Sequence, residues 1–410
     1  MSRRGLFAGW FGGSTPASTA DHWIVRAFGA KTASGVTVSE YSALNLPVVY
    51  ACVNRIANPI AMFPLQIFRA DENGEPVEDR QHRLNQVLRV RPNPVMNTRD
   101  LKKTGQTHAC LWGNAYQEIQ RNGAGEVVGL WPLMPWATTP DKRGDQLRFK
   151  TTIDGQTFSL PADNVVHVMD LSLDGYVGLS PIQQARSAVG LAQAAEIYGE
   201  KFFANDAKSG GFLQHPGKLS PKARENITDA VEERTGLDNA HRIKVLEEGM
   251  KFIPTTIPPD DAQFLSTREF QIGEIARMYN VPLFLLQHSQ PGTVWGSGME
   301  QMVIAFIVHA LEPWTTAWEA EYNLKLFSEA ERAAGYFVKF NMNSLLRGDM
   351  AARSAFYASG IGAGWLLPSE ARRKEDLPRV DGIDDRATAQ PAVPASAPAQ
   401  PEDDDNDADI

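Results

Sequence analysis

The sequence predicts an α+β fold, on three observations. Helical patterns alternate with β-hairpin signals between about residues 38 and 173. Two long helical segments then bracket a compact α/β segment of about fifty residues. In the third, residues 261–314, a helical pattern is followed by a proline, a glycine-rich loop and a second helix. The strand-rich part is expected to be antiparallel because hairpin turns join its strands.

The first 37 residues are predicted to form a flexible arm, because they are rich in Gly, Ser, Thr and Ala and lack sustained periodicity. A helix is expected next, ending near Phe63 and Pro64. The apolar residues that suggest it are Val48, Ala51, Cys52, Ile56, Ile60 and Met62. Residues 65–69 alternate as a strand, and the Asn-Gly pair that ends residues 71–74 is a hairpin signal.

The same alternation continues. Asn97 or Thr98 is a candidate cap for a helix that runs to Trp112. Residues 115–121 and 126–134 are predicted strands joined by a glycine turn, and further strands are expected at residues 149–153, 157–160 and 165–171. The glycine turn is interpreted as a hairpin, because the sequence contains neither of the two common phosphate-loop motifs.

Ser180 and Pro181 predict a helix start, since serine is a good cap and proline fits the first helical position. This helix is expected to reach about Ala204, and its many alanines allow another helix to approach closely. Residues 208–260 then predict a strand and turn, a polar amphipathic helix and one or two further strands. We interpret the polar helix as a solvated face, with a docking surface as the alternative. Its charged residues are Lys222, Arg224, Glu225, Asp229, Glu232, Glu233 and Arg234.

Residues 261–281 predict a second long helix with one apolar and one polar face. The apolar face is expected to hold Leu265, Ile272, Ile275, Ala276 and Tyr279, and the wet face Arg268, Glu269, Gln271, Glu274 and Arg277. Pro282 should end this helix, because proline disfavours helix at the residue before it. Residues 283–298 predict a mobile loop with one large aromatic side chain, Trp295. A helix from Met299 should be kinked by Pro313.

Near the C-terminus, a strand around Phe337 is expected to return to the antiparallel region. Asp349 should open a short helix, and Ser369 is a candidate cap for another. Residues 387–410 consist mainly of Ala, Pro, Gln and Asp and predict a disordered acidic tail.

Net charge, cysteine content and the lengths of apolar segments exclude several classes of function. The net charge is −9, and six acidic residues lie in the last ten, so the rest of the chain carries about −3. This balance argues against a strongly basic nucleic-acid binder. Cys52 and Cys110 belong to no C-x-x-C pair and predict buried thiols in a reducing compartment. The apolar run near the N-terminus is too short for a signal peptide, and the apolar segment at residues 302–308 is too short to span a membrane. We therefore expect a soluble protein with no membrane role.

A search for catalytic motifs finds no nucleotide-binding loop, metal cluster, catalytic triad or paired carboxylates in the sequence. His167, in an apolar strand close to Asp170, could be a metal ligand or general base. We favour a hydrogen-bonded structural histidine, because no second ligand stands at a suitable spacing. Asp260 and Asp261 lie at a helix start, where acidic residues complement the helix dipole. No catalytic residue, metal or cofactor is predicted, and an assembly protein is favoured over an enzyme.

Seven stretches, taken in order, resemble the portal or head-to-tail connector proteins of tailed double-stranded DNA phages, in particular the long-tailed branch. They are YACVNRIANPIAMFPLQIFR, RPNPVMNTRDL, LWGNAYQEIQRNGAGEVVGLWPL, VVHVMDLSLDGYVGLSPI, FFANDAKSGGFLQHPGKLS, KVLEEGMKFIPTTIPPDDAQFLSTREFQIGEIARMYNVP and LLRGDMAARSAFYASGIGAG. Together they cover roughly residues 38–385. One departure is local: the family often has Asn-Glu-x-Arg after the glycine turn, where this chain has Pro-Ser-Glu-Ala-Arg at residues 368–372.

The resemblance implies a portal fold with a strand-rich wing, a two-helix stem, a small α/β clip, a tunnel loop with a kinked helix, and a helical crown. After the arm at 1–37 come the wing at 38–178, the first stem helix at 179–207, the clip at 208–260, the second stem helix at 261–281, the tunnel loop at 282–298, the kinked helix and returning wing strand at 299–345, the crown helices at 346–386 and the tail at 387–410.

The resemblance also implies a function. The subunit would form a homo-oligomeric ring, dodecameric in capsids, at one vertex of the virion, through which double-stranded DNA is packaged and ejected. The expected partners are DNA without sequence specificity, the terminase large subunit, the head-tail adaptor, and the major capsid and scaffold proteins, with assembly in the host cytoplasm. Gln287, His288, Gln290, Thr293, Trp295 and Ser297 would line the channel, and Lys222, Arg224, Glu225, Glu232 and Glu233 would form a clip docking surface.

Two other readings stay open from the residues alone. The first is an unrecognised hydrolase that uses His167 and Asp170. The second is a nonviral helical scaffold or adaptor that pairs through the alanine-rich helix.

Overall fold

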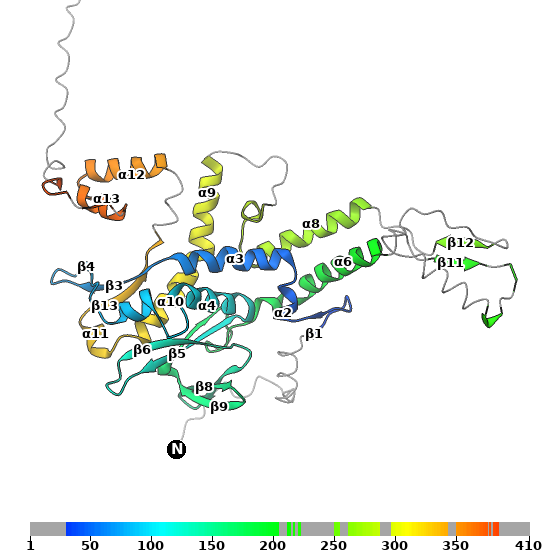
Figure 1. Ribbon diagram of the computed structural model, residues 1–410, viewed down its shortest axis with the longest axis horizontal. Coiled ribbons are helices and arrows are strands. Elements are labelled where there is room, and N and C mark those ends of the chain that lie inside the picture. The colour runs from blue at the N-terminus through cyan, green and yellow to red at the C-terminus, as the bar shows by residue number, and fades with distance from the viewer. Residues whose placement is uncertain are drawn as a thin grey trace, which may run out of the picture. The chain divides into compact units, whose positions relative to one another are not determined.

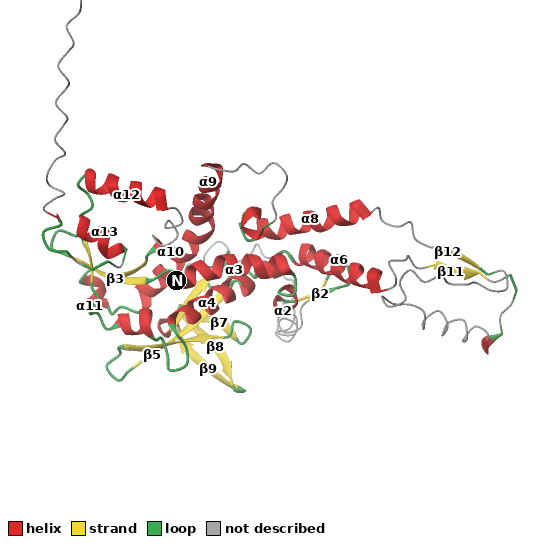
Figure 2. Cartoon of the chain, turned by 45° about the horizontal axis from the view of Figure 1, so that its top comes forward, coloured by secondary structure: helices red, strands yellow, loops and turns green. Residues whose placement is uncertain are grey.

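The computed structural model describes residues 30–384, with gaps at 205–210, 215, 218–219, 223–249, 255–260, 288–296, 343–349, 376 and 379 (Figure 1). Of the expected flexible arm, residues 1–37, the first 29 residues lie outside this range, as does the expected tail from residue 387. Residues 30–37 were wrongly included in the arm, because they belong to a hairpin of two paired strands. The chain divides into two compact units, residues 1–341 and 342–410. Helices and antiparallel sheets are both present in the described residues, which confirms the α+β class (Figure 2).

The first unit opens with a short hairpin. β1 (Ala30–Lys31) pairs with β2 (Thr37–Val38), and α2 (Glu40–Ala43) follows with Ser39 as its cap. Helix α3 (Pro47–Met62) comes next and ends at the expected residue, with Phe63 as its C-cap.

The apolar face of α3 differs from the predicted one. Its buried stripe is Val49, Cys52, Val53, Ile56, Ala57 and Ile60, whereas Met62 is 66 % exposed. The steps of three and four that begin at Val49 place this stripe toward the neighbouring elements and turn Met62 outward.

One three-stranded antiparallel sheet joins the two ends of the unit. β3 (Leu65–Ala70) lies between β4 (Pro76–Glu78) and β13 (Tyr336–Phe340), with Phe68 opposite Phe337. The expected turn after β3 is present, because the Gly74 N–H donates to the Asp71 carbonyl. The predicted strand near Phe337 therefore returns to β3.

A second sheet packs against helix α4 (Thr98–Trp112), whose N-cap is Asn97, as predicted; its side chain accepts from the Asp100 N–H at 2.8 Å. The sheet has the order β10-β5-β6, with β5 at Asn114–Arg121, β6 at Val127–Leu133 and β10 at Val165–Met169. Gly113 makes the turn from α4 to β5 with φ of +69°, and a Cβ there would lie 2.0 Å from the Leu179 carbonyl oxygen.

A third sheet contains a strand that the sequence did not predict. β7 (Thr138–Arg143), β8 (Gln146–Ile153) and β9 (Gln156–Pro161) form an antiparallel meander. β7 was missed because its sequence, TTPDKR, is polar and lacks apolar alternation. Phe149 of β8 packs with Tyr116, Leu133 and Val165, which joins this sheet to the second one.

Two long helices lie side by side beyond the sheets (Figure 1). The first was predicted as one helix but is divided at Ala185 into α5 (Pro181–Gln184) and α6 (Arg186–Ala204). Ser180 caps α5 as predicted, accepting from the Gln183 N–H at 3.2 Å. The second is α8 (Asp261–Met278), and between them in the chain β11 (Gly211–Gln214) pairs with β12 (Lys251–Pro254).

The chain then passes through η4 (Leu283–Leu286) to α9 (Ser297–Phe306), the π-helical segment η5 (Ile307–Leu311), α10 (Glu312–Lys325) and α11 (Glu329–Ala333). Two shorter elements, η1 (Gln86–Val90) and η2 (Ala162–Asn164), lie in the connections before α4 and β10. α10 is anchored by buried polar contacts. The Trp318 indole donates to Gln106 Oε1 at 2.9 Å, and the Tyr322 hydroxyl lies 3.1 Å from Gln117 Oε1.

The second unit contains α12 (Met350–Gly362) and α13 (Pro368–Lys374). Phe356 and Trp365 pack edge to face, with ring centroids 5.2 Å apart. Ser369 does not cap α13 as predicted, because the helix begins at Pro368 and Ser369 is its second residue. Leu367 occupies the cap position, where its N–H donates to the Glu370 carboxylate at 3.0 Å. Across both units, no described helix combines the length and apolarity that crossing a membrane requires.

Candidate functional site

The end of α8 is joined to two other helices by side-chain hydrogen bonds. Ile275, Ala276 and Tyr279 are buried, as their spacing predicted. The Tyr279 hydroxyl donates to the Cys110 carbonyl at 3.2 Å, and burial raises the pKa of this phenol. The last turn of α8 is thereby fixed to α4 through a long-range hydrogen bond.

Asn280 then links this helix end to η5. It has a left-handed backbone, with φ of +53°, a conformation that asparagine tolerates at the end of a helix. Its side-chain amide donates to the His309 carbonyl at 3.0 Å. The α-helical partner of that carbonyl would be the N–H of residue 313, which is a proline and has none. Asn280 thus supplies a hydrogen bond at the place where Pro313 removes one.

The two predicted prolines lie at helix boundaries. Pro282 is the cap residue of η4, four residues after α8 ends at Met278. Pro313 stands in the first turn of α10, directly after η5. The irregularity expected at Pro313 lies in the preceding turn, because the proline ring clashes with the carbonyl four residues earlier.

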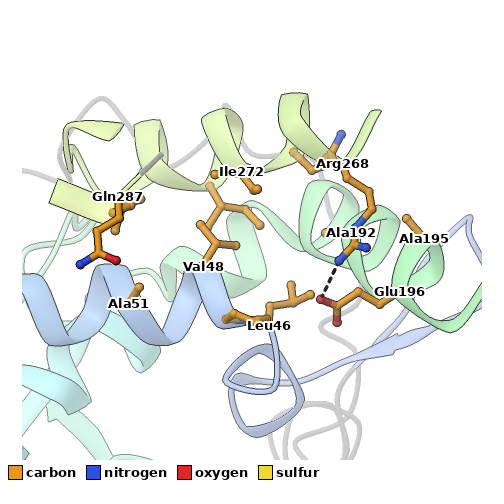
Figure 3. Close-up of a pocket in the computed structure, with 13 residues that line it drawn as sticks. Leu46, Val48, Ala51, Ala192, Ala195, Glu196, Arg268, Ile272 and Gln287 are labelled. Atoms are coloured by element: carbon orange, nitrogen blue, oxygen red, sulfur yellow. Dashed lines mark ion pairs between the residues drawn. The ribbon is translucent and has the colours of Figure 1, made fainter. Parts of the chain in front are cut away.

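One residue of the predicted wet face of α8 is buried. Gln271 is only 6 % exposed, and its Oε1 has no hydrogen-bond partner among the described residues. It faces a cavity of about 310 Å³ between the start of α3, α6, α8 and η4 (Figure 3). The prediction for Gln271 was wrong, because side chains from α3 and α6 enclose this polar position.

The cavity has apolar walls and a charged rim. Its walls are formed chiefly by Leu46, Val48, Ala51, Ala192, Ala195 and Ile272. On the rim, Arg268 of α8 forms an ion pair with Glu196 of α6, with Nη2 3.7 Å from Oε1, and the Arg268 side chain remains 48 % exposed (Figure 3). The alanines of α6 allow this approach, as their number in the sequence suggested.

The predicted channel residues are only partly described. Gln287 is exposed, ends η4 with φ of +57° and lines the same cavity. Ser297 is the first residue of α9. His288, Gln290, Thr293 and Trp295 lie outside the described residues, so this part of the prediction stays a prediction.

The predicted docking surface in residues 208–260 is also only partly described. Lys222 is exposed in a short helical turn. Arg224, Glu225, Glu232 and Glu233 lie outside the described residues.

His167 has a structural environment. Its Nε2 lies 3.0 Å from Asn114 Oδ1, its ring stacks on Tyr116, and burial lowers its pKa to about 3. Its hydrogen-bond partner is therefore an amide, whereas the Asp170 carboxylate accepts from the Leu171 N–H. No group of three or more His, Cys, Asp or Glu side chains that could hold a metal occurs in the described parts of the chain.

The thiols are buried, as predicted. Cys52 and Cys110 are free and almost wholly inaccessible, and burial raises the pKa of each thiol to about 12. Neither thiol is prepared for nucleophilic chemistry, because the reactive thiolate is disfavoured.

Large apolar side chains remain exposed on the two long helices. Leu191, Ile197 and Tyr198 of α6 are each more than 40 % exposed, and Phe270 of α8 is 61 % exposed. Large apolar side chains in contact with water are available for a protein-protein contact.

Comparisons with known proteins cover most of the chain. The family described as "Phage portal protein" matches residues 47–376. A "Probable portal protein" of Streptomyces phage phiC31 is 36% identical over 373 residues, 87% of this chain and 80% of the relative. The "Portal protein" of Enterobacteria phage HK97 is 30% identical over 350 residues, 85% of this chain and 82% of the relative. A chain from the solved neck of a native gene transfer agent (GTA) particle, computed with C12 symmetry, has a similar fold: the TM-score is 0.54 at 23% identity, covering 83% of this chain and 94% of that chain.

Proposed function

This chain belongs to the phage portal protein family, and from that premise we propose that twelve copies form a closed ring at one capsid vertex, through which double-stranded DNA enters and leaves. It is a portal protein of the long-tailed double-stranded DNA phage type. The observation that carries the proposal is the family match, which spans the wing sheets, both long helices and the first helices of the second unit.

The ring is supported by the surface of a single subunit. The exposed apolar side chains of α6 and α8 would be buried if neighbouring copies packed against each other in a ring, which favours association. In a cyclic ring every such contact is identical, and one patch meets a different patch of the next copy. The similar fold in a neck computed with C12 symmetry supports twelve as the number of copies.

The predicted regions keep their places in this proposal. The wing is residues 38–178 with β13, and α5, α6 and α8 form the stem. Residues 208–260, with β11 and β12, form the clip, and α12 and α13 contribute to the crown. Residues 282–298 form the tunnel loop, which follows the Asn280 contact and includes η4 and the first two residues of α9.

The tunnel loop would line the channel without gripping DNA. Residues 287–297 contain no Lys, Arg, Asp or Glu, and His288 is their one titratable side chain. A row of lysines would bind phosphates and make passage strongly dependent on salt, whereas neutral polar groups let the duplex slide.

The partners follow from the same proposal. The chain has no nucleotide-binding motif, so the work of packaging would come from the terminase large subunit, docked on the clip. The head-tail adaptor would later take that place, and the major capsid and scaffold proteins would surround the wing during assembly in the host cytoplasm. We infer no catalytic activity and no cofactor for the chain itself.

Electron microscopy of the purified chain tests the ring. Closed rings with a central hole, counted in top views, are expected at micromolar concentration. A protein that stays monomeric at high concentration, also when scaffold and capsid protein are supplied, would overturn the proposal.

A packaging assay tests the loop. Trp295→Ala combined with a shortened loop should change the amount of DNA packaged or retained, and an equal shortening of the Asn122–Gly125 turn is the control. Unchanged packaging and unchanged retention would refute the channel role.

A further inference from the structure

The loop between β10 and α5 exposes two leucines. Leu171 is 68 % exposed and Leu173 is 85 % exposed, the largest exposed fraction among the large apolar residues that the structure describes. Both lie within residues 171–179, which we call the leucine loop.

The leucine loop is tied together by its own hydrogen bonds. The Leu179 N–H donates to the Leu171 carbonyl at 2.8 Å, which closes the loop at its base. Inside it, Asp174 Oδ1 accepts from the N–H groups of Tyr176 and Val177, each at 2.9 Å, and the Ser172 hydroxyl donates to the Val177 carbonyl at 2.7 Å. A loop held in one shape loses little conformational entropy when it binds, so its exposed leucines are prepared for a contact.

The side of the loop is held as well. Lys142 of β7 places its ammonium group 4.6 Å from the centroid of the Tyr176 ring, a cation–π contact. Within the leucine loop, Asp174 is the one charged residue, and Asp170 directly precedes the loop.

The cavity beside Gln271 has the complementary properties. Its walls are apolar, its volume of about 310 Å³ can accept aliphatic side chains, and its rim carries the Arg268–Glu196 ion pair, in which the Arg268 side chain is the more exposed partner (Figure 3). Gln271 Oε1 is buried there without a donor. A polypeptide loop brings apolar side chains and backbone N–H groups together, so it suits this cavity better than a purely apolar ligand.

We propose that, in the ring, the leucine loop of one copy enters the Gln271 cavity of the next copy. Leu173 packs against the alanine wall of α6, and the acidic loop lies toward Arg268. The loop and the cavity share no residue, so the contact joins two different surfaces of the same chain. Contacts of this kind propagate from copy to copy and close into a ring when the rotation allows. This inference rests on the proposed ring.

Cysteine cross-linking tests the contact directly. The variant Leu173→Cys with Ala195→Cys puts one thiol on the loop and one on the cavity wall, while Cys52 and Cys110 stay buried. Mild oxidation of assembled rings is expected to give a ladder of covalent multimers on a denaturing gel. Each single variant is the matched control and should give no ladder. If assembled rings of the double variant give no ladder after oxidation, the proposed contact is wrong, whereas the proposed ring is unaffected.

A charge on the loop tests its contribution to assembly. Leu173→Asp should raise the concentration needed for half-maximal ring formation by about tenfold or more, since it removes an apolar contact from every interface. Val95→Asp is the control, because Val95 is 76 % exposed in a different loop. Thermal unfolding of both variants should match the parent. Equal assembly of the parent and Leu173→Asp would overturn the contact, and a parent chain that never forms rings would overturn it together with the proposed function.

Discussion

Replacing Asn280 separates two contributions at the end of α8. Asn280→Ala removes the hydrogen bond to the His309 carbonyl and forces a Cβ-bearing residue without a polar side chain into the left-handed region, where φ is +53°. Asn280→Gly removes the same hydrogen bond and accepts the same backbone at little cost.

The magnitudes follow from these two effects. An exposed hydrogen bond contributes about 0.5–1 kcal/mol, and the left-handed conformation costs about 1 kcal/mol for alanine. Asn280→Ala should therefore lower the free energy of unfolding by about 2 kcal/mol and Asn280→Gly by about 1 kcal/mol. This order is the reverse of that inside a helix, where glycine is worse than alanine.

Urea denaturation of the isolated subunit, followed by tryptophan fluorescence, measures both changes. The slope of the free energy with urea should be the same for all three proteins, so that midpoints can be compared. If Asn280→Ala were as stable as Asn280→Gly, the left-handed conformation would not be the source of the cost. If both matched the parent, the contact with η5 would contribute nothing.

Three further predictions concern the helices and sheets before residue 178. Burial lowers the pKa of His167 to about 3 and that of His108 to about 4. The stability that the neutral rings contribute is therefore fully present above pH 6.5 and is lost as the pH falls from 6.5 toward 3. His167→Gln should flatten the acid limb of a stability-pH profile by up to about 5 kcal/mol. Gly113→Ala should lower the free energy of unfolding by about 3 kcal/mol or more, because its Cβ would meet the Leu179 carbonyl. The control Gly125→Ala has a similar φ but open space around it and should cost about 1 kcal/mol. Equal changes in the melting temperature of the two variants would refute the steric account. Burial lowers the pKa of Lys102 to about 8, so the free energy of unfolding should rise between pH 8 and pH 10.5, where Lys102 is neutral when folded and charged when unfolded. Lys102→Met should remove that rise, and chemical denaturation at pH 8 and at pH 10.5 measures it.

The local elements were largely predictable from local chemistry. Asn97, Ser180 and the Asn-Gly turn after β3 each have a role that depends on residues within four positions, and each lies where the sequence placed it. β7 was missed because a polar strand at the side of a sheet needs no apolar alternation. The division between α5 and α6 at Ala185 has no glycine or proline to mark it.

The candidate site depended on distant partners, and these were not predictable. The burial of Gln271 results from α3 and from Ala192 and Ala195 of α6, which are more than seventy residues away in the chain. The Asn280 contact with His309 joins positions 29 residues apart. An asparagine two residues before a proline at a helix end was a signal for the left-handed turn, but nothing in the sequence names the carbonyl that it reaches. The portal function came from the ordered resemblance of long stretches rather than from any single motif.

The pairing of β3 with β13 sets the order in which a subunit can be completed during synthesis. The paired strands are about 270 residues apart, and everything from the β3 turn to α11 lies between them. At 5–20 residues per second, the ribosome needs roughly 15–50 seconds to make that interval. The first sheet therefore stays unfinished until both long helices and residues 282–298 have been translated. A nascent chain cannot offer this sheet to a neighbour before it has made residues 282–298, which we propose to line the channel.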